Sequence, residues 1–369
     1  MIRISSLCLM FCAAALLGCP AWSQSWTVGL FHRPVTTPII TPDANASFLD
    51  PVTQQTVHWE AMHTFNPAAV VDGDKIAVLY RAEDDSGDNA IGSHTSRLGL
   101  AESRDGVHFT RLPEPVFFPA HDAQQSREWP GGVEDPRLVQ AEDGTYVLTY
   151  TQWNRKTYTV GIATSKDLRH WTKYGPAFAD AAGGKYKDLA YKSAGILTRV
   201  QDGRLVAARL HGLYWMYWGE VEVHLAISSD LIHWKPVEDA AGKPKVLLRA
   251  RPDLFDSAFP EIGAPPVLLP KGIVVFYNGK NAATGGDPSI GRGAYSAGQA
   301  LFSSKDPSRL IARTEQPYLK PELPFEKSGQ YAAGTVFTEG LVLFHQHWWM
   351  YYGTADSLVG VASAPIPNQ

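Results

Sequence analysis

Polar side chains stand at the start of several apolar segments that otherwise read as buried strands. Asn66, Asp135 and Lys192 lie at or next to such starts, and Glu261 lies just before a fourth. Carboxylates, an amide and an amine that converge in a concave pocket can bind a polar ligand and move protons, so together they form a candidate site. Each residue taken alone is better explained as a strand-end group that satisfies backbone hydrogen bonds.

Two prolines follow the first two of these residues directly. Pro67 comes after Asn66, and Pro136 comes after Asp135. Proline is tolerated at the first residues of a strand, where its missing N–H group is not needed. The match indicates that Asn66 and Asp135 occupy equivalent positions in two successive structural units.

Arg81 ends the second strand of the first unit and is followed by the acidic residues 83–85. Its guanidinium could reach toward the same pocket as Asn66. It could equally form a surface ion pair within the acidic run, and such pairs contribute little to stability. Both interpretations stay open.

The elements that must position these residues repeat along the chain. Five times a short apolar strand leads into a Gly-containing turn and a second apolar strand, and three units close with the phrase Ser-x-Asp-x-x-His followed by an aromatic residue. Such a period is typical of a radial array of small sheets. We therefore expect an all-β, five-bladed propeller whose inner strands line one funnel. The five strand starts are in segments 66–71, 134–139, 192–197, 263–269 and 333–337.

The first 23 residues have the pattern of a secretory signal peptide. Arg3 precedes an apolar stretch over residues 7–17, and small residues surround a cleavage point near residue 23. An alternative is a lipoprotein signal with a lipid anchor at Cys19. Both predict export to the periplasm or the outside, with residues 24–369 as a single propeller domain.

Composition excludes several classes of function. All three cysteines lie in the leader, so no disulfide framework or zinc–cysteine cluster is expected. Without the leader, 32 basic and 37 acidic residues remain, a net charge of −5, which argues against nucleic acid as a partner. No second long apolar run predicts a membrane span.

Aromatic residues are abundant, with 11 Trp, 15 Tyr and 15 Phe. Most are explained by packing between blades. Runs over residues 214–218 and 348–352 could instead present alternate side chains for stacking on sugar rings.

Six motifs, in order along the chain, resemble those of glycoside hydrolase family 130. They are FNPAAV at 65–70, LYRAED at 79–84, GVEDPR at 132–137, GAPP at 263–266, the segment 297–307 and YYGTAD at 351–356. The resemblance runs from about residue 65 to residue 362. It implies a five-bladed propeller that acts on β-mannosides, by phosphorolysis in some members and by hydrolysis in others.

The resemblance also implies roles for individual residues. Asp135 would be the acid that protonates the glycosidic oxygen through the sugar's 3-hydroxyl, and Asn66 and Arg81 would hold the mannose ring. Further substrate-binding residues expected in the pocket are Asp84, Lys192, His211, Tyr331 and Asp356.

Hydrolysis is the reaction that the residues favour over phosphorolysis. Asn278 stands where the phosphorolytic members of the family tend to have His. Lys192 is then a single basic donor, whereas phosphate sites usually gather several. Glu220 and Glu261 are available as bases, and an inverting glycosidase needs such a carboxylate about 6.5–9.5 Å from its acid. The expected substrate is an oligosaccharide with β-linked mannose, including β-1,2 linkages.

Three alternatives stay open beside this hypothesis. A β-mannoside phosphorylase would use inorganic phosphate as a co-substrate, although export favours a hydrolase because a sugar phosphate is most useful in the cytoplasm. A furanosidase or a glycan-binding propeller without activity would use the same fold. No cofactor and no metal is expected, since the pair His345 and His347 has no acid in register.

Overall fold

The structure, a computed structural model, describes residues 26–88 and 90–366. The expected leader, Cys19 and the domain start at residue 24 lie outside the described residues and stay predictions. Within the described ranges the regular structure is almost entirely β, as expected. The helices there are α1 (Gln125–Glu128) and two 3₁₀ turns (Ala181–Gly184 and Pro324–Lys327). None of them is long and apolar enough to cross a bilayer.

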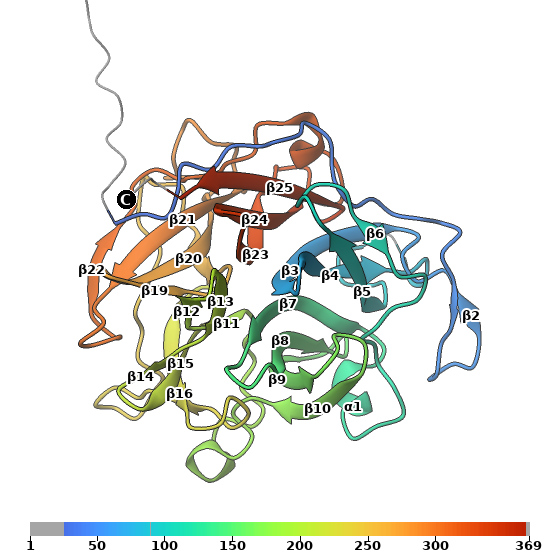
Figure 1. Ribbon diagram of the computed structural model, residues 1–369, viewed down its shortest axis with the longest axis horizontal. Coiled ribbons are helices and arrows are strands. Elements are labelled where there is room, and N and C mark those ends of the chain that lie inside the picture. Colours follow the sequence, from blue (N-terminus) through green and yellow to red (C-terminus); the bar gives the residue numbers. More distant parts are fainter. Residues whose placement is uncertain (1–25, 89, 367–369) are drawn as a thin grey trace, which may run out of the picture.

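The strands form groups that follow one another in the sequence and surround the middle of the molecule in Figure 1. Neighbouring strands within a group are mostly antiparallel hairpins. The first group contains β3 (His63–Asp72), β4 (Lys75–Glu83), β5 (Ser96–Ser103) and β6 (Thr110–Arg111). The second contains β7 (Gly132–Gln140), β8 (Tyr146–Trp153), β9 (Tyr158–Ser165) and β10 (Trp171–Pro176).

The third group is more broken than the first two. It contains β11 (Ala194–Ile196), β12 (Thr198–Gln201), β13 (Arg204–Ala207), β14 (Arg209–Leu210), β15 (Leu213–Trp218), β16 (His224–Ser228) and β17 (Lys235–Pro236). The fourth contains β18 (Phe259–Ile262), β19 (Val267–Leu269), β20 (Gly272–Lys280), β21 (Tyr295–Phe302) and β22 (Leu310–Arg313), and the fifth β23 (Phe337–Phe344), β24 (His347–Thr354) and β25 (Leu358–Pro365). A separate hairpin pairs β1 (Phe48–Leu49) with β2 (Thr56–Val57).

Buried apolar side chains join these groups in a cycle. Each of five core clusters in the described chain contains strands from two neighbouring groups, and the last cluster joins the fifth group to the first. In order around the molecule the clusters include Leu79 with Leu148, Val147 with Met216, Tyr217 with Val275, Val274 with Met350, and Val342 with Val78. Because every group is packed on both sides, the starts of the inner strands are directed toward a common centre.

The fifth group is completed by chain from the other end of the sequence. Backbone hydrogen bonds join His32 to Ser363 in both directions, at 2.9 and 2.8 Å, and an isolated bridge pairs Ile40 with Val359. Figure 1 shows this early segment, drawn in blue, running beside β25. Residues 32–40 thus cover the outer edge of the last group.

The repeated phrase of the sequence forms one turn, used three times. It connects β5 to β6, β9 to β10 and β16 to β17. In each copy the Ser hydroxyl lies 3.0–3.1 Å from the Asp carboxylate, and the His Nδ1 lies 2.7–2.8 Å from that carboxylate's second oxygen. The carboxylate also accepts two backbone N–H bonds, as in the pairs of Asp230 with Ile232 and His233. The spacing repeated in these three phrases therefore reflects the geometry of the turn.

Replacing Asp230 by Ala should lower the free energy of unfolding by about 1 kcal/mol, because two backbone N–H groups lose their acceptor in a turn that water can partly reach. His233→Ala leaves those two bonds intact and should cost less. Urea unfolding of both variants checks the order, and an equal loss in the two would contradict this account of the turn.

Candidate active site

Two β-bulges aim the first pair of polar residues into the centre. The register of β3 against β4 shifts between Phe65 and Pro67, and that of β7 against β8 shifts between Glu134 and Arg137. Asn66 and Asp135 sit at these bulges with φ angles of 45° and 47°. A positive φ is costly for a non-glycine residue and marks positions where function or packing imposes it. The predicted equivalence of the two positions is thus visible in the backbone.

The bulged residues contact each other across the two strands. Asn66 Nδ2 donates to Asp135 Oδ1 at 2.8 Å. Strand β24 approaches Asn66 closely, because a Cβ added to Gly353 would lie 2.0 Å from Asn66 Oδ1. Glycine at position 353 therefore leaves room for the Asn66 amide.

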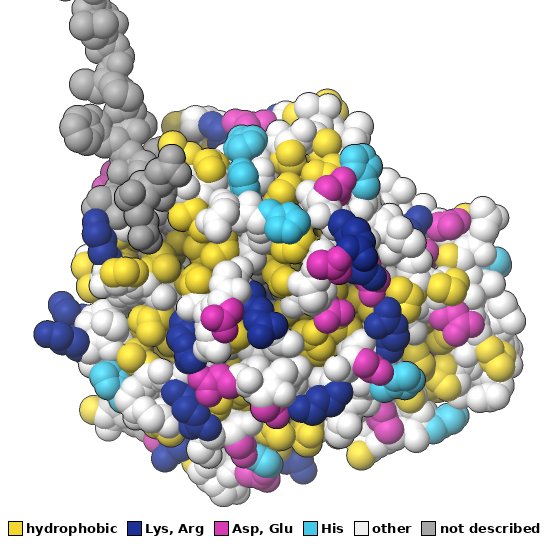
Figure 2. All heavy atoms as spheres, viewed as in Figure 1, with side chains coloured by type: hydrophobic (Ala, Val, Ile, Leu, Met, Phe, Trp, Pro, Cys, Tyr) yellow, Lys and Arg dark blue, Asp and Glu magenta, His cyan; other side chains and the backbone are white. Residues whose placement is uncertain are grey.

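These residues line a cavity of about 340 Å³. Eight of the ten residues expected at the site are among its walls, namely Asn66, Arg81, Asp135, Lys192, Glu220, Glu261, Tyr331 and Asp356. The walls also include Phe65, Ile91, Gly92, Glu134, Thr151, Trp153, Tyr158, Tyr295 and Phe337. Figure 2 shows acidic and basic side chains interspersed on one face of the molecule, without a continuous basic area.

Arg81 is buried and makes both kinds of contact that its sequence position allowed. Its guanidinium lies 3.1 Å from Asp135 Oδ1, 2.8 Å from Glu134 Oε1 and 2.6 Å from Glu83 Oε1. Its Nε donates to Ser96 Oγ at 3.0 Å. The pair with Glu83 belongs to the acidic run, but it lies inside the protein and not at the surface.

Lys192 holds a second set of carboxylates together. Its Nζ lies 3.6 Å from Asp135, 3.8 Å from Glu220 and 3.5 Å from Glu261. Burial alone would lower the pKa of Lys192. The three carboxylates have the larger combined effect and raise this pKa well above its ordinary value. The amine is therefore a permanent cation whose charge is shared among three acids.

Asp135 is ionised in the ligand-free protein. Burial raises its pKa, but the charges of Lys192, Arg81 and Arg137 together with the Asn66 hydrogen bond hold that pKa well below the ordinary value. The expected proton donor thus has to gain its proton when substrate binds.

The neighbouring acids keep their protons to higher pH than ordinary carboxyls do. Burial, with Arg81 opposing it, raises the pKa of Glu134 to about 7, and burial likewise raises the pKa of Asp356 to about 6. Burial also raises the pKa of Glu261. Such separation of pKa values among clustered carboxyls is typical of acid–base sites.

Glu220 and Glu261 differ in their access to water. A β-bridge pairs the two residues. Glu261 is 1% exposed and accepts a 2.6 Å hydrogen bond from Ser193 Oγ, whereas the Glu220 side chain is 20% exposed and accepts from the Tyr158 hydroxyl at 2.9 Å. Glu220 is therefore the carboxylate better placed to meet a water molecule.

Two expected substrate ligands do not belong to the cavity. His211 lies in the exposed turn between β14 and β15, with φ 56°, and its Nε2 contacts the Ser304 carbonyl at 2.9 Å. Asp84 is buried in an ion pair with Arg97 at 2.7 Å. Successive side chains in extended chain point in opposite directions. The Glu83 side chain contacts Arg81, so the side chain of the next residue, Asp84, points away from Arg81 and contacts Arg97.

Two further sequence features lie outside the walls of the cavity. The Asn278 amide bonds the backbone and hydroxyl of Thr338 and is not a wall of the cavity, so its identity says little about a phosphate. The runs over 214–218 and 348–352 supply core residues such as Trp218 and Tyr351, because both faces of these middle strands are covered.

Sequence reasoning missed nine walls of the cavity, among them Glu134 and the four aromatic residues Trp153, Tyr158, Tyr295 and Phe337. Glu134 was open to prediction, since it precedes Asp135 within one motif. The four aromatic residues come from strand ends that carry no polar signal. Tyr295 packs against Tyr331 and Phe337, with ring centroids 5.5 and 5.6 Å apart.

The family model of glycoside hydrolase family 130, described as beta-1,4-mannooligosaccharide phosphorylase, matches residues 36–368. The chain belongs to glycoside hydrolase family 130. A 1,2-beta-oligomannan phosphorylase from Thermoanaerobacter sp. (strain X514) is 33% identical to this family 130 protein over 307 residues, which cover 82% of this chain and 90% of the relative.

Two solved structures are more similar to this family 130 protein. One, described with the words "the GH130 family of mannoside phosphorylases contains glycoside hydrolases that target beta-1,2 mannosidic linkages in Candida mannan", is 49% identical with a TM-score of 0.91, over 93% of this chain and 98% of that one. The other is a glycosyl hydrolase from Bacteroides ovatus, 49% identical with a TM-score of 0.90, over 93% and 97% of the two chains.

Replacing Asp135 by Asn should reduce cleavage of a β-mannoside by about 10²- to 10⁴-fold. The amide keeps the acceptor for Asn66 but carries neither the charge nor the proton of the acid. Steady-state turnover is the measurement, and His211→Ala, which lies outside the cavity, should keep wild-type turnover. Near wild-type activity in the Asn variant would remove Asp135 from the mechanism.

The raised pKa of Asp356 has a signature in stability. Below about pH 4 its carboxyl is neutral in both the folded and unfolded states. Between pH 4 and its folded pKa of about 6, the unfolded chain loses the proton first, so folding becomes less favourable as pH rises. The stability of the wild type relative to Asp356→Asn should fall across this window and level off above it. Urea unfolding of both proteins from pH 4 to 8 tests this, and a constant or growing difference would contradict it.

Proposed function

We propose that this family 130 protein hydrolyses β-mannosidic bonds, with β-1,2-linked mannooligosaccharides as substrates and inversion at the anomeric carbon. The observation that carries the proposal is the charge of the cavity. Two cations, Arg81 and Lys192, and five carboxylates line it. Each cation is already within 4 Å of three carboxylates. Such a site suits a neutral sugar and a water molecule better than an added phosphate, which the carboxylates would repel.

The proposed chemistry assigns a task to each side of the cavity. Asn66 and Arg81 bind mannose hydroxyls, while the aromatic walls cover the apolar faces of the ring. A sugar hydroxyl inserted between Lys192 and Asp135 weakens their interaction, so the Asp135 pKa rises and the carboxylate takes up a proton from the solvent. The acid then donates this proton toward the glycosidic oxygen. Glu220, which water can reach, removes a proton from the attacking water on the opposite face of the sugar.

Three parts of the proposal concern the whole chain. The five strand groups, packed in a cycle, support a five-bladed propeller with the cavity at its centre. Residues 24–369 form this single domain after removal of the leader. The leader directs the protein to the periplasm or the outside, where free mannose is a usable product.

Phosphorolysis is the second candidate. The family model and the Thermoanaerobacter relative both carry the names of phosphorylases. By name these comparisons support phosphorolysis more directly than hydrolysis. The solved structure with a TM-score of 0.91 supports hydrolysis, since its description reports hydrolases within the family.

One assay distinguishes the two reactions. The purified protein is incubated with β-1,2- and β-1,4-mannobiose, with and without millimolar phosphate, and the products are separated by chromatography. We expect mannose only, a rate that phosphate does not change, and β-1,2-mannobiose as the better substrate. Glu220→Gln should lower this rate by about 10²-fold or more, as expected for loss of a general base. Mannose 1-phosphate, formed at a rate that increases with phosphate, would establish the phosphorylase instead.

A further inference from the structure

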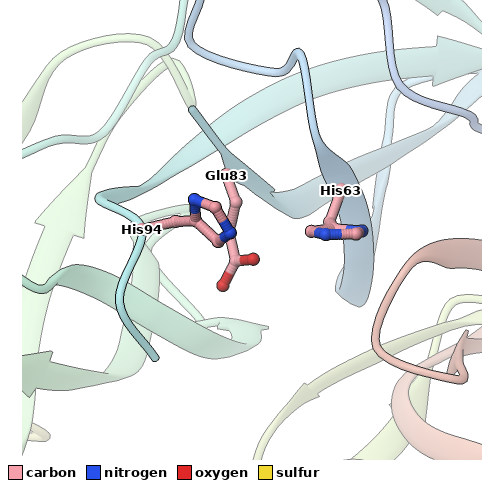
Figure 3. A group of neighbouring side chains, drawn as sticks. All are labelled: His63, Glu83 and His94. Carbon is pink, nitrogen blue, oxygen red and sulfur yellow. The ribbon is translucent and has the colours of Figure 1, made fainter. Parts of the chain in front are cut away.

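Two histidines and a glutamate meet beside the cavity. His63 and Glu83 are direct cross-strand partners on β3 and β4, so their side chains share one face of the sheet. His94 comes from the segment that leads into β5 and approaches the same point (Figure 3). One ligand atom from each of the three residues lies within 4.8 Å of the others, and the two imidazole centroids are 5.8 Å apart.

The hydrogen bonds of the two imidazoles leave nitrogen lone pairs available. His94 Nδ1 lies 2.7 Å from the Ser86 carbonyl, which can only accept, so Nδ1 carries the proton and Nε2 has a free lone pair. A histidine whose second nitrogen is fixed by a carbonyl is the usual arrangement of a metal ligand. His63 Nδ1 is buried and has no hydrogen-bond partner. A buried polar atom without a partner is costly unless something binds it.

Glu83 can accept a further ligand without giving up its present ones. Its Oε1 accepts from Arg81 at 2.6 Å and its Oε2 from Gln330 at 3.0 Å. A carboxylate offers about four lone-pair positions, so two remain.

We propose that His63, Glu83 and His94 form a binding site for a divalent transition-metal ion of the Zn²⁺ type. Two imidazole nitrogens and one carboxylate oxygen match the ligands of Zn²⁺ and its neighbours, whereas Ca²⁺ and Mg²⁺ prefer oxygen alone. Tetrahedral Zn²⁺ with ligands at about 2.0–2.2 Å needs donor atoms closer together than 4.8 Å. Rotations of the side chains would have to close that gap when an ion binds.

The ion would connect the first strand group to the rim of the cavity. The segment between β4 and β5 carries Ile91 and Gly92, which are cavity walls, and His94 is its anchor. Glu83 in turn contacts Arg81, which contacts Asp135. Metal binding is thus expected to order the rim and to hold Glu83 against Arg81. This inference does not depend on which reaction the cavity carries out.

The test uses the protein spanning residues 24–369, after treatment with a chelator. Zn²⁺, Co²⁺ and Ca²⁺ are titrated separately by calorimetry and by thermal unfolding, and the Co²⁺ complex is also followed by its visible spectrum. We expect about one Zn²⁺ or Co²⁺ per chain, a higher melting temperature with either ion, a Co²⁺ spectrum of low coordination number and no response to Ca²⁺.

Variants assign the site to these residues. His94→Ala and His63→Ala should each weaken Zn²⁺ binding by at least about 10- to 100-fold and abolish the thermal shift. His211→Ala, which changes an exposed histidine elsewhere, should bind as the wild type does. If His63→Ala does not fold, His94→Gln provides the same measurement with less loss of volume. Absence of saturable Zn²⁺ binding in the wild type, or unchanged binding in the His94 variants, would overturn the proposal.

Discussion

The structure depends on apolar packing that passes from each strand group to the next and returns to the first. Since each group is covered on both sides, the inner ends of its strands converge with those of the other groups, and several buried charged residues meet there. The five clusters also fix the distances between residues far apart in sequence, such as Asn66 and Asp135. Packing at the periphery therefore determines the geometry at the centre.

The centre itself is a balanced set of charges. Arg81 and Lys192 approach Asp135 from two sides, and Arg137 lies beneath it, donating to the Asp135 carbonyl at 2.9 Å and pairing with the buried Glu339 at 2.9 Å. Buried ion pairs recover their desolvation cost only with good geometry and are a weak source of stability. Their value here is electrostatic: they favour the ionised form of Asp135, while Glu134 and Asp356 keep their protons to higher pH than ordinary carboxyls do.

Some of this site could be predicted from the sequence, because the chemistry left a local signal. The matching prolines after Asn66 and Asp135 indicated that the two positions are equivalent, and polar residues at apolar strand starts indicated Lys192 and Glu261. Other positions depend on long-range packing that no local pattern encodes. The side-chain directions of Asp84 and Asn278 are decided by Arg97 and Thr338, and the turn that carries His211 is exposed. The aromatic runs were misleading because neighbouring strand groups pack on both faces of β15 and β24.

The pairing of residues 32–40 with β25 gives the protein a particular order of assembly. A ribosome must make residues 359–363 before the edge formed by the early segment has a partner. Until then, the early segment is an unpaired edge of the kind that can join a neighbouring chain. Such distant contacts also slow folding, because a long loop must close before they form. The synthesis of β25 therefore controls when the early segment becomes a paired edge.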